Sequence, residues 1–179
     1  FRDMAKRGGH GSNYFGKPRT MAKFLKIEPS VMEEFQGKYF KAFPGIREWQ
    51  YRTATQLQSR GFLTTPFGRK RHFLGRLSEN ATIREAIAFG PQSLIADYMN
   101  AGVCRLWSWG RVKLLAQVHD AVVFEYPDDS DHLIPEVCRI LSAPIPLSDG
   151  RTFSVPSEGL CGWNWGKATK TNPWGLVKF

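Results

Sequence analysis

The start of the chain, RDMAKRGGHGSNYFG, carries a polar or aromatic side chain at nearly every fourth residue: Arg2, Lys6, His10 and Tyr14. On a helix, side chains four residues apart lie on nearly the same face, so this spacing predicts one polar stripe. Two cations near the N-terminus of a helix suit a chain of phosphates, which Arg can bind in a bidentate manner. Three glycines, Gly8, Gly9 and Gly11, each weaken a helix by about 1 kcal/mol, so we expect this helix to need tertiary support.

A second polar group, His119 and Asp120, interrupts the apolar segment LLAQVHDAVVFEY. The alternation of side chains predicts two extended pieces, residues 114–118 and 121–126, joined at this pair. A buried, unpaired carboxylate is costly, so we expect Asp120 at an exposed turn or beside a cation. A plain hairpin with a turn-favoured Asp would explain the pair without any ligand. A carboxylate at a hairpin tip also suits Mg²⁺, although a two-ion site needs at least two carboxylates.

Arg84 and Gln92 form a third candidate pair, eight residues apart in a helical pattern. At about 100° per residue, their side chains lie within about 80° of each other on a continuous helix. A Gln on a basic scaffold can contact the minor-groove acceptors that every base pair offers. A solvated Gln on a helix surface is the simpler interpretation.

Residues 11–17, GSNYFGK, nearly match the phosphate-binding loop G-x-x-x-x-G-K-[ST]. Pro18 stands where that loop needs a hydroxyl for its metal ion, and charged residues replace the buried strand that should precede it. The pattern therefore does not favour a phosphate-binding loop of this kind. A solvated basic helix without a ligand stays open as an interpretation of residues 2–14.

The composition indicates a folded, basic protein: 179 residues, 42% of them hydrophobic, with a formal net charge of +9. This length suffices for one domain or two small ones. The charge favours a polyanionic partner, nucleic acid first and an anionic membrane surface second. The three cysteines lie far apart without a C-x-x-C pair, so neither a disulfide framework nor a zinc site is indicated. No apolar run approaches the ~18 residues of a membrane span. The chain begins with Phe1 and enters a helical pattern at once, so we expect a piece of a longer protein.

The elements that would position these residues follow an α+β order. Residues 1–60 read mostly as helices, with a new element starting at Pro29, a break at Pro44 and Gly45, a further helix at residues 46–60, and a cap at Gly61. Residues 61–74 predict a basic hairpin with its turn near Phe67 and Gly68. A long helical pattern covers residues 80–109, which Pro91 should bend or restart. The hairpin at residues 114–126 and a helix at residues 132–141 complete the pattern.

Taken in order, these segments resemble the C-terminal part of the family A (DNA polymerase I-like) DNA polymerases, and look most similar to the bacteriophage-type branch. The segments are RDMAK with Tyr14, then GFLTTPFGRKRHF, Arg84 and Gln92, QVHD, and VPSEGLCGWNWGKA. The strongest anchors are the R-x-x-x-K-x-x-x-x-x-x-x-Y helix, called motif B, and Q-V-H-D, called motif C. The resemblance covers nearly all of the chain and implies an α+β fold. Fingers would span residues 1–80, and part of a palm with an antiparallel sheet would span residues 81–179.

The resemblance also implies roles for the nucleotide-binding residues. By position, Arg2 and Lys6 would bind the triphosphate of a dNTP, and Lys6 would also be a proton donor to pyrophosphate. His10 would face the sugar and base of that nucleotide, and Tyr14 would stack near the templating base.

For the DNA and the metal, the resemblance implies contacts of Arg84 and Gln92 with the duplex near the primer end. His119 would contact the primer terminus, and Asp120 would be one of two metal-binding aspartates holding two Mg²⁺ ions. The implied partners are primer-template DNA, dNTPs and the upstream part of the same polypeptide. The implied location is the cytoplasm of a bacterial or phage-infected cell.

The chain departs from the family pattern at several positions. His10 replaces an aromatic Phe or Tyr, Ala88 replaces an Asn, and Ala121 replaces the Glu that follows the metal-binding Asp. Glu125 lies at an odd offset from Asp120 along a strand and so on the other face. No motif A is present, so we expect its aspartate upstream of Phe1 and the isolated chain to be inactive.

The alternative function is a basic, non-catalytic nucleic-acid-binding module derived from a polymerase. Ala121 and the lack of motif A favour it. A membrane-surface protein comes third, because no long amphipathic apolar face accompanies the cations.

Overall fold

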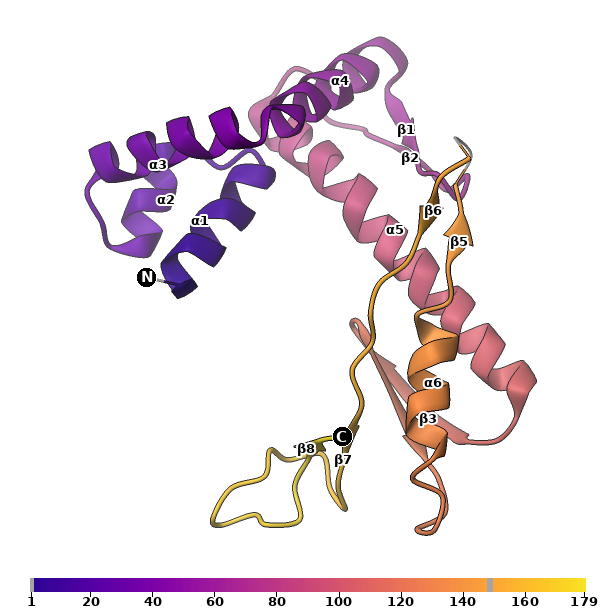
Figure 1. Cartoon of the computed structure of the whole chain (residues 1–179). Helices are drawn as coiled ribbons and strands as arrows, with labels where there is room; N and C mark the ends of the chain where they lie inside the picture. Colours follow the sequence, from indigo (N-terminus) through magenta and orange to yellow (C-terminus); the bar gives the residue numbers. More distant parts are fainter. Residues whose placement is uncertain (1, 148–149) are drawn as a thin grey trace. The chain divides into compact units, whose positions relative to one another are not determined.

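The computed structural model describes residues 2–147 and 150–179. These residues form two compact units, which divide between Ser93 and Leu94. Helix α5, Asn80–Trp109, contributes its first half to one unit and its second half to the other. The predicted α+β class is confirmed, since helices are combined with short antiparallel strand pairs (Figure 1). In the part of the chain that is described, no helix is both long enough and apolar enough to span a bilayer.

The first unit begins with four helices, α1 (Arg2–Asn13), α2 (Pro18–Leu25), α3 (Pro29–Ala42) and α4 (Pro44–Arg60). Proline occupies the first position of the last three, where its missing N–H removes no intrahelical bond. Gly61 ends α4 in the left-handed conformation, with φ 70° and its N–H donating to the Leu57 carbonyl. The predicted helices and the predicted cap are therefore confirmed.

Two apolar clusters stabilise this unit. One joins α4 and the start of α5 across the hairpin of β1 (Phe62–Thr64) and β2 (Lys70–His72), and its buried members are Leu57, Leu63, Phe73, Ile83, Ala86, Ile87 and Phe89. The other joins α2 and α3 through Met21, Ala22 and Met32. The hairpin turns at Gly68, with φ 82°, as the sequence predicts.

The second unit pairs β3 (Lys113–Val118) with β4 (Ala121–Glu125) in antiparallel register. This hairpin packs on the end of α5 and on α6 (Leu133–Leu141) around buried Leu106, Val137 and Leu141. Two further antiparallel pairs follow, β5 (Ile145–Pro146) with β6 (Thr152–Phe153) and β7 (Leu160–Cys161) with β8 (Val177–Lys178). The Tyr98 hydroxyl fastens α5 to these segments, accepting from the Val155 N–H and donating to the Ala143 carbonyl, each at 3.2 Å.

Pro91 does not end the long helix, because α5 runs through it as one element. Proline has no N–H, so the carbonyl of Ile87, four residues earlier, receives no helical hydrogen bond there. Ile87 is fully buried in the first apolar cluster, and this packing holds the helix together where the hydrogen bond is lacking.

Candidate functional site

The polar stripe predicted at the start of the chain lies on helix α1. Arg2, Lys6 and His10 are all exposed, and neither Arg2 nor Lys6 forms an ion pair with a described residue. Tyr14 follows the helix end and is half-buried, with its ring 4.7 Å from the His10 ring in an edge-on arrangement. The structure therefore brings these four residues onto one side of one helix and its C-terminal turn.

The glycines of α1 explain how this helix is held. Gly8 and Gly9 are buried. A Cβ on Gly8 would lie 3.1 Å from Phe35 Cε1, and a Cβ on Gly9 would lie 3.4 Å from Tyr39 Cε2. The missing side chains therefore let two aromatic rings of α3 lie against the α1 backbone. Lys6 and His10 each lie two residues from Gly8, about 200° around the helix, so this part of the polar stripe faces away from the Phe35 ring.

A buried amide cluster fixes the end of α1. Gln36 Nε2 donates to Ser12 Oγ at 3.1 Å and to the Gly16 carbonyl at 2.9 Å. Gln50 Nε2 donates to the carbonyls of Ser12 and Asn13, at 2.8 and 2.9 Å. The last carbonyls of a helix have no partner within it, so these side chains satisfy groups that would otherwise be buried without a donor. Tyr14 follows directly after this fixed backbone.

Sequence reasoning missed Gln36 and Gln50. Both lie on the buried side of their helices, Gln36 one turn after Met32 and Gln50 in a row with Thr53 and Leu57. A polar residue within an apolar row at helical spacing is the signal that could have identified them, because a buried amide needs hydrogen-bond partners.

The hairpin of β3 and β4 presents the other candidate residues. Val118 pairs with Ala121, so His119 and Asp120 form a two-residue turn. His119 has φ 54°, the left-handed conformation that such short turns favour and that costs a non-glycine residue about 1–2 kcal/mol. Both side chains are exposed, and the Asp120 carboxylate forms no ion pair within the described residues. The expected exposed turn is confirmed.

Glu125 lies at the other end of the same hairpin. It pairs with Lys113 in the strand register, and its Oε2 lies 2.9 Å from Lys113 Nζ. This carboxylate is therefore used in a surface ion pair and does not supplement Asp120, in agreement with its odd offset.

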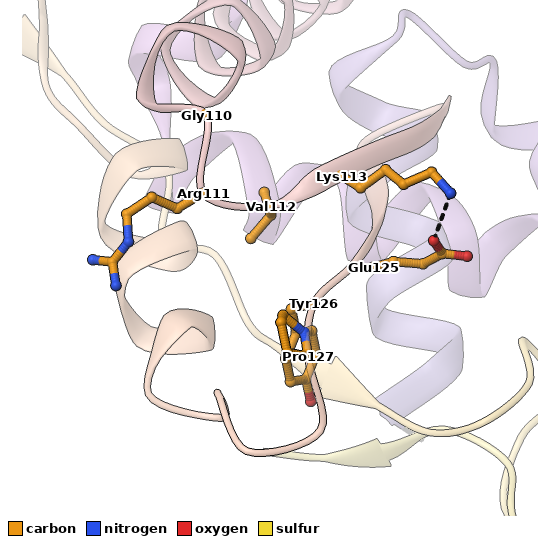
Figure 2. A pocket seen from close by; sticks show the side chains of 7 residues that line it. All are labelled: Gly110, Arg111, Val112, Lys113, Glu125, Tyr126 and Pro127. Atoms are coloured by element: carbon orange, nitrogen blue, oxygen red, sulfur yellow. Dashed lines mark hydrogen bonds and ion pairs between the residues drawn. The ribbon is translucent and has the colours of Figure 1, made fainter.

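A shallow hollow of about 440 Å³ opens at that far end, and none of the predicted site residues lines it (Figure 2). Its lining consists of Gly110, Arg111, Val112, Lys113, Glu125, Tyr126 and Pro127. Burial, and next the hydrogen bond to Asp131, raises the pKa of Tyr126 to about 12, so its hydroxyl stays protonated at neutral pH. Within the lining, Lys113 pairs with Glu125, and Tyr126 donates to Asp131 outside it, so we do not place the candidate chemistry in this hollow.

Arg84 and Gln92 lie on the first half of α5, and both are exposed. They belong to the first unit with the α1 stripe, whereas His119 and Asp120 belong to the second. The candidate site thus consists of two separately described parts.

In the unit that contains the hairpin turn, Asp120 is the candidate ligand for a metal ion. Across residues 2–147 and 150–179, no three His, Cys, Asp or Glu side chains come together to hold a metal ion. The exposed Asp120 fits one hard oxygen ligand for Mg²⁺, which takes about six oxygens, many of them from water and phosphates. The remaining ligands would have to come from outside these residues.

The sequence of residues 1–166 matches the profile of the family described as DNA polymerase family A. The chain belongs to DNA polymerase family A. Among curated family A relatives, it is 34% identical over 138 residues to the thermostable DNA polymerase I of Thermus filiformis, covering 72% of this chain and 16% of that enzyme. It is 29% identical over 172 residues to DNA polymerase I of Pseudomonas aeruginosa, covering 89% of this chain and 18% of that enzyme.

A solved structure confirms the family A fold. The POL domain of Pol1 from M. smegmatis, in complex with DNA primer-template and dNTP, superposes with a TM-score of 0.72 at 24% identity. The match covers 82% of this chain and 28% of that one. The chain spans less than a fifth of the length of the Thermus filiformis and Pseudomonas aeruginosa enzymes.

Proposed function

We propose that this chain is the fingers, about residues 1–80, and the C-terminal part of the palm, about residues 81–179, of a DNA-directed DNA polymerase. The observation that carries the proposal is the family match over residues 1–166, which includes both the polar stripe of α1 and the turn at Asp120. The substrates would be dNTPs and a primer-template DNA, and the reaction would add a nucleotide to the primer 3′-hydroxyl. Such an enzyme acts inside the cell, where the DNA is.

The α1 stripe would bind the incoming nucleotide. Arg2 and Lys6 are exposed cations on one helix face, which suits them to neutralise a triphosphate. Lys6 carries protons that it can donate to the leaving pyrophosphate oxygen. His10, one turn further, would face the sugar and base, and Tyr14, in edge-on contact with it, would stack near the templating base.

The duplex would be contacted from α5 and from the hairpin turn. Arg84 offers a cation to a phosphate, and Gln92 offers an amide to minor-groove acceptors. Both are exposed on one helix. His119, whose ring is exposed and whose backbone is fixed by a two-residue turn, would contact the primer terminus.

Asp120 would be one of the two aspartates that hold Mg²⁺. Two bound Mg²⁺ ions stabilise the attacking and leaving oxygens of a phosphoryl transfer. Asp120 contributes an exposed carboxylate that competes with no described ion pair, and a second carboxylate must come from another part of the complete polymerase. We therefore expect the isolated chain to bind DNA weakly, in a strongly salt-dependent way, and to incorporate no nucleotide.

The test is Asp120→Asn in the complete polymerase that contains these residues, measured by single-nucleotide primer extension and by duplex binding. Losing a metal ligand removes several kcal/mol of charge stabilisation, so we expect extension to fall by about 10²-fold or more while duplex affinity is kept. Asp128→Asn is the matched control, because Asp128 is another exposed aspartate of the same unit. Extension by Asp120→Asn at the rate of the control would exclude Asp120 from the mechanism.

One set of observations favours a second candidate, a non-catalytic nucleic-acid-binding module. Ala121 follows Asp120 with no carboxylate, and the described residues gather no metal-binding group. The same assay separates the two functions. Duplex binding without extension by the unsubstituted complete protein supports the module and refutes the polymerase.

A further inference from the structure

The end of the chain folds into a loop, residues 159–179, which we call the tryptophan loop. Strands β7 and β8 close its base, where the Phe179 N–H donates to the Gly159 carbonyl at 3.0 Å. Further from the base, the backbone N–H of Trp163 donates to the Trp174 carbonyl at 2.9 Å. These two residues therefore lie side by side, one on the first arm of the loop, which follows β7, and one on the second arm, which leads into β8. The family match ends at residue 166, so most of the second arm lies beyond it.

Backbone contacts and amides, with no apolar cluster, hold this loop together. A Cβ on Gly162 would lie 2.6 Å from the Gly175 carbonyl oxygen, and one on Gly175 would overlap the Gly166 carbonyl oxygen. The side-chain amides of Asn164 and Asn172 exchange two hydrogen bonds, at 2.9 and 3.0 Å. The two arms are therefore packed as closely as glycine permits, without help from the large side chains.

Three indoles consequently remain in solvent. The side chains of Trp163, Trp165 and Trp174 are 73%, 56% and 65% exposed. Exposed apolar side chains are common when single, but three large aromatic rings within one small loop indicate an interaction surface. Because backbone contacts and amides define the loop without these indoles, packing within the loop does not explain their presence.

The charge of the loop restricts the partner. Residues 159–179 contain three lysines and no acidic residue. Lys178 pairs with Glu158 at 2.9 Å, whereas Lys167 and Lys170 form no ion pair with a described residue. Aromatic rings next to unpaired cations suit a ligand with flat apolar faces and negative charges.

We propose that the tryptophan loop binds single-stranded nucleic acid, with unpaired bases stacked on Trp163, Trp165 and Trp174 and phosphates against Lys167 and Lys170. Only unpaired bases expose faces for stacking, which favours a single strand over a duplex. Trp is enriched in protein interfaces but Lys is depleted there, so the unpaired lysines of the loop are what favour a nucleic-acid partner over a protein. The binding site goes beyond nucleotide addition and does not depend on it.

The experiment measures binding of the intact 179-residue chain to a labelled oligothymidylate of about 16 nucleotides and to a duplex, by fluorescence anisotropy. We expect Trp174→Ala to weaken oligothymidylate binding by about 5- to 150-fold, the range for loss of one stacked base. Duplex binding should change by less than about twofold, since paired bases do not stack on the loop. Trp107→Ala, which removes an indole that is 77% exposed outside the loop, should change neither.

Two further variants separate stacking from folding of the loop. Trp174→Phe keeps an aromatic face and should restore most of the affinity that Trp174→Ala loses. Lys170→Gln should reduce the salt dependence of oligothymidylate binding by about 0.7 in the logarithmic slope. The proposal is overturned if Trp174→Ala binds as tightly as the unsubstituted chain. It is equally overturned if Trp174→Phe fails to restore affinity, or if duplex and single-strand affinity fall together.

Discussion

Gln50→Met tests whether the buried amide cluster holds the end of α1. Gln50 is 2% exposed, and Met has a similar length but donates no hydrogen bond. The Asn13 carbonyl then loses its donor from the described residues, whereas the Ser12 carbonyl still accepts from the Phe15 N–H at 3.3 Å. The substitution thus leaves the Asn13 carbonyl without a donor among the described residues and reduces the donors of the Ser12 carbonyl from two to one.

The magnitude follows from three contributions. A lost hydrogen bond costs about 1 kcal/mol, and a buried carbonyl left unsatisfied costs about 1–3 kcal/mol. Gln50 Oε1 is itself buried without a partner, so its removal returns about 1 kcal/mol. The expected decrease in the free energy of unfolding is therefore roughly 1 to 3 kcal/mol.

Urea unfolding of the intact chain, followed by circular dichroism, measures this free energy. Gln58→Met is the matched control, because Gln58 is exposed on the same helix and its replacement should stay within about 0.5 kcal/mol. If Gln50→Met is as stable as Gln58→Met, the amide cluster does not hold α1 and the reasoning is wrong.

Two further predictions concern the stripe and the cysteines. Lys6→Ala in the complete polymerase should slow nucleotide incorporation by about 10²-fold, as expected for loss of a proton donor, with a smaller loss of duplex affinity. Equal losses in primer extension and duplex binding would identify Lys6 as a general phosphate contact instead. Burial raises the pKa of the Cys138 thiol, so at pH 8 it holds less of the reactive thiolate than an unshifted thiol. Iodoacetamide should therefore modify the exposed Cys104 first, and the modification rate of Cys138 should rise with pH. In urea the modification rates of the two cysteines should converge. Peptide mass mapping measures both rates, and equal rates in the native chain would contradict the prediction.

The backbone elements were predictable because local signals mark their ends. Pro29 begins α3, Pro44 separates α3 from α4, Gly61 caps α4, and Gly68 turns the first hairpin. The alternation around His119 and Asp120 located the second hairpin. Each of these signals acts through the conformation of one or two residues, so no knowledge of distant contacts is needed.

The support of the site was less predictable, because it depends on distant contacts. From the sequence, the glycines of α1 only lower helix stability. The structure adds the reason for them, because Phe35 and Tyr39 pack against Gly8 and Gly9. The continuity of α5 through Pro91 depends on burial of Ile87, and the roles of Gln36 and Gln50 depend on carbonyls far away in the chain. The assignments of Arg2, Lys6, His10, Tyr14, Arg84, Gln92, His119 and Asp120 stay predictions.

The two sides of α1 face different evolutionary constraints. A methyl group on Gly8 would lie 3.1 Å from the Phe35 ring and would require that ring to shift, whereas one on Gly9 would reach ordinary contact with Tyr39, so the Gly8 position is the more constrained. His10 projects into solvent on the other side, where exchange for Phe or Tyr leaves the supporting contacts unchanged. Under the role proposed for His10, a substitution at this position would change nucleotide preference without disturbing the contacts between α1 and α3.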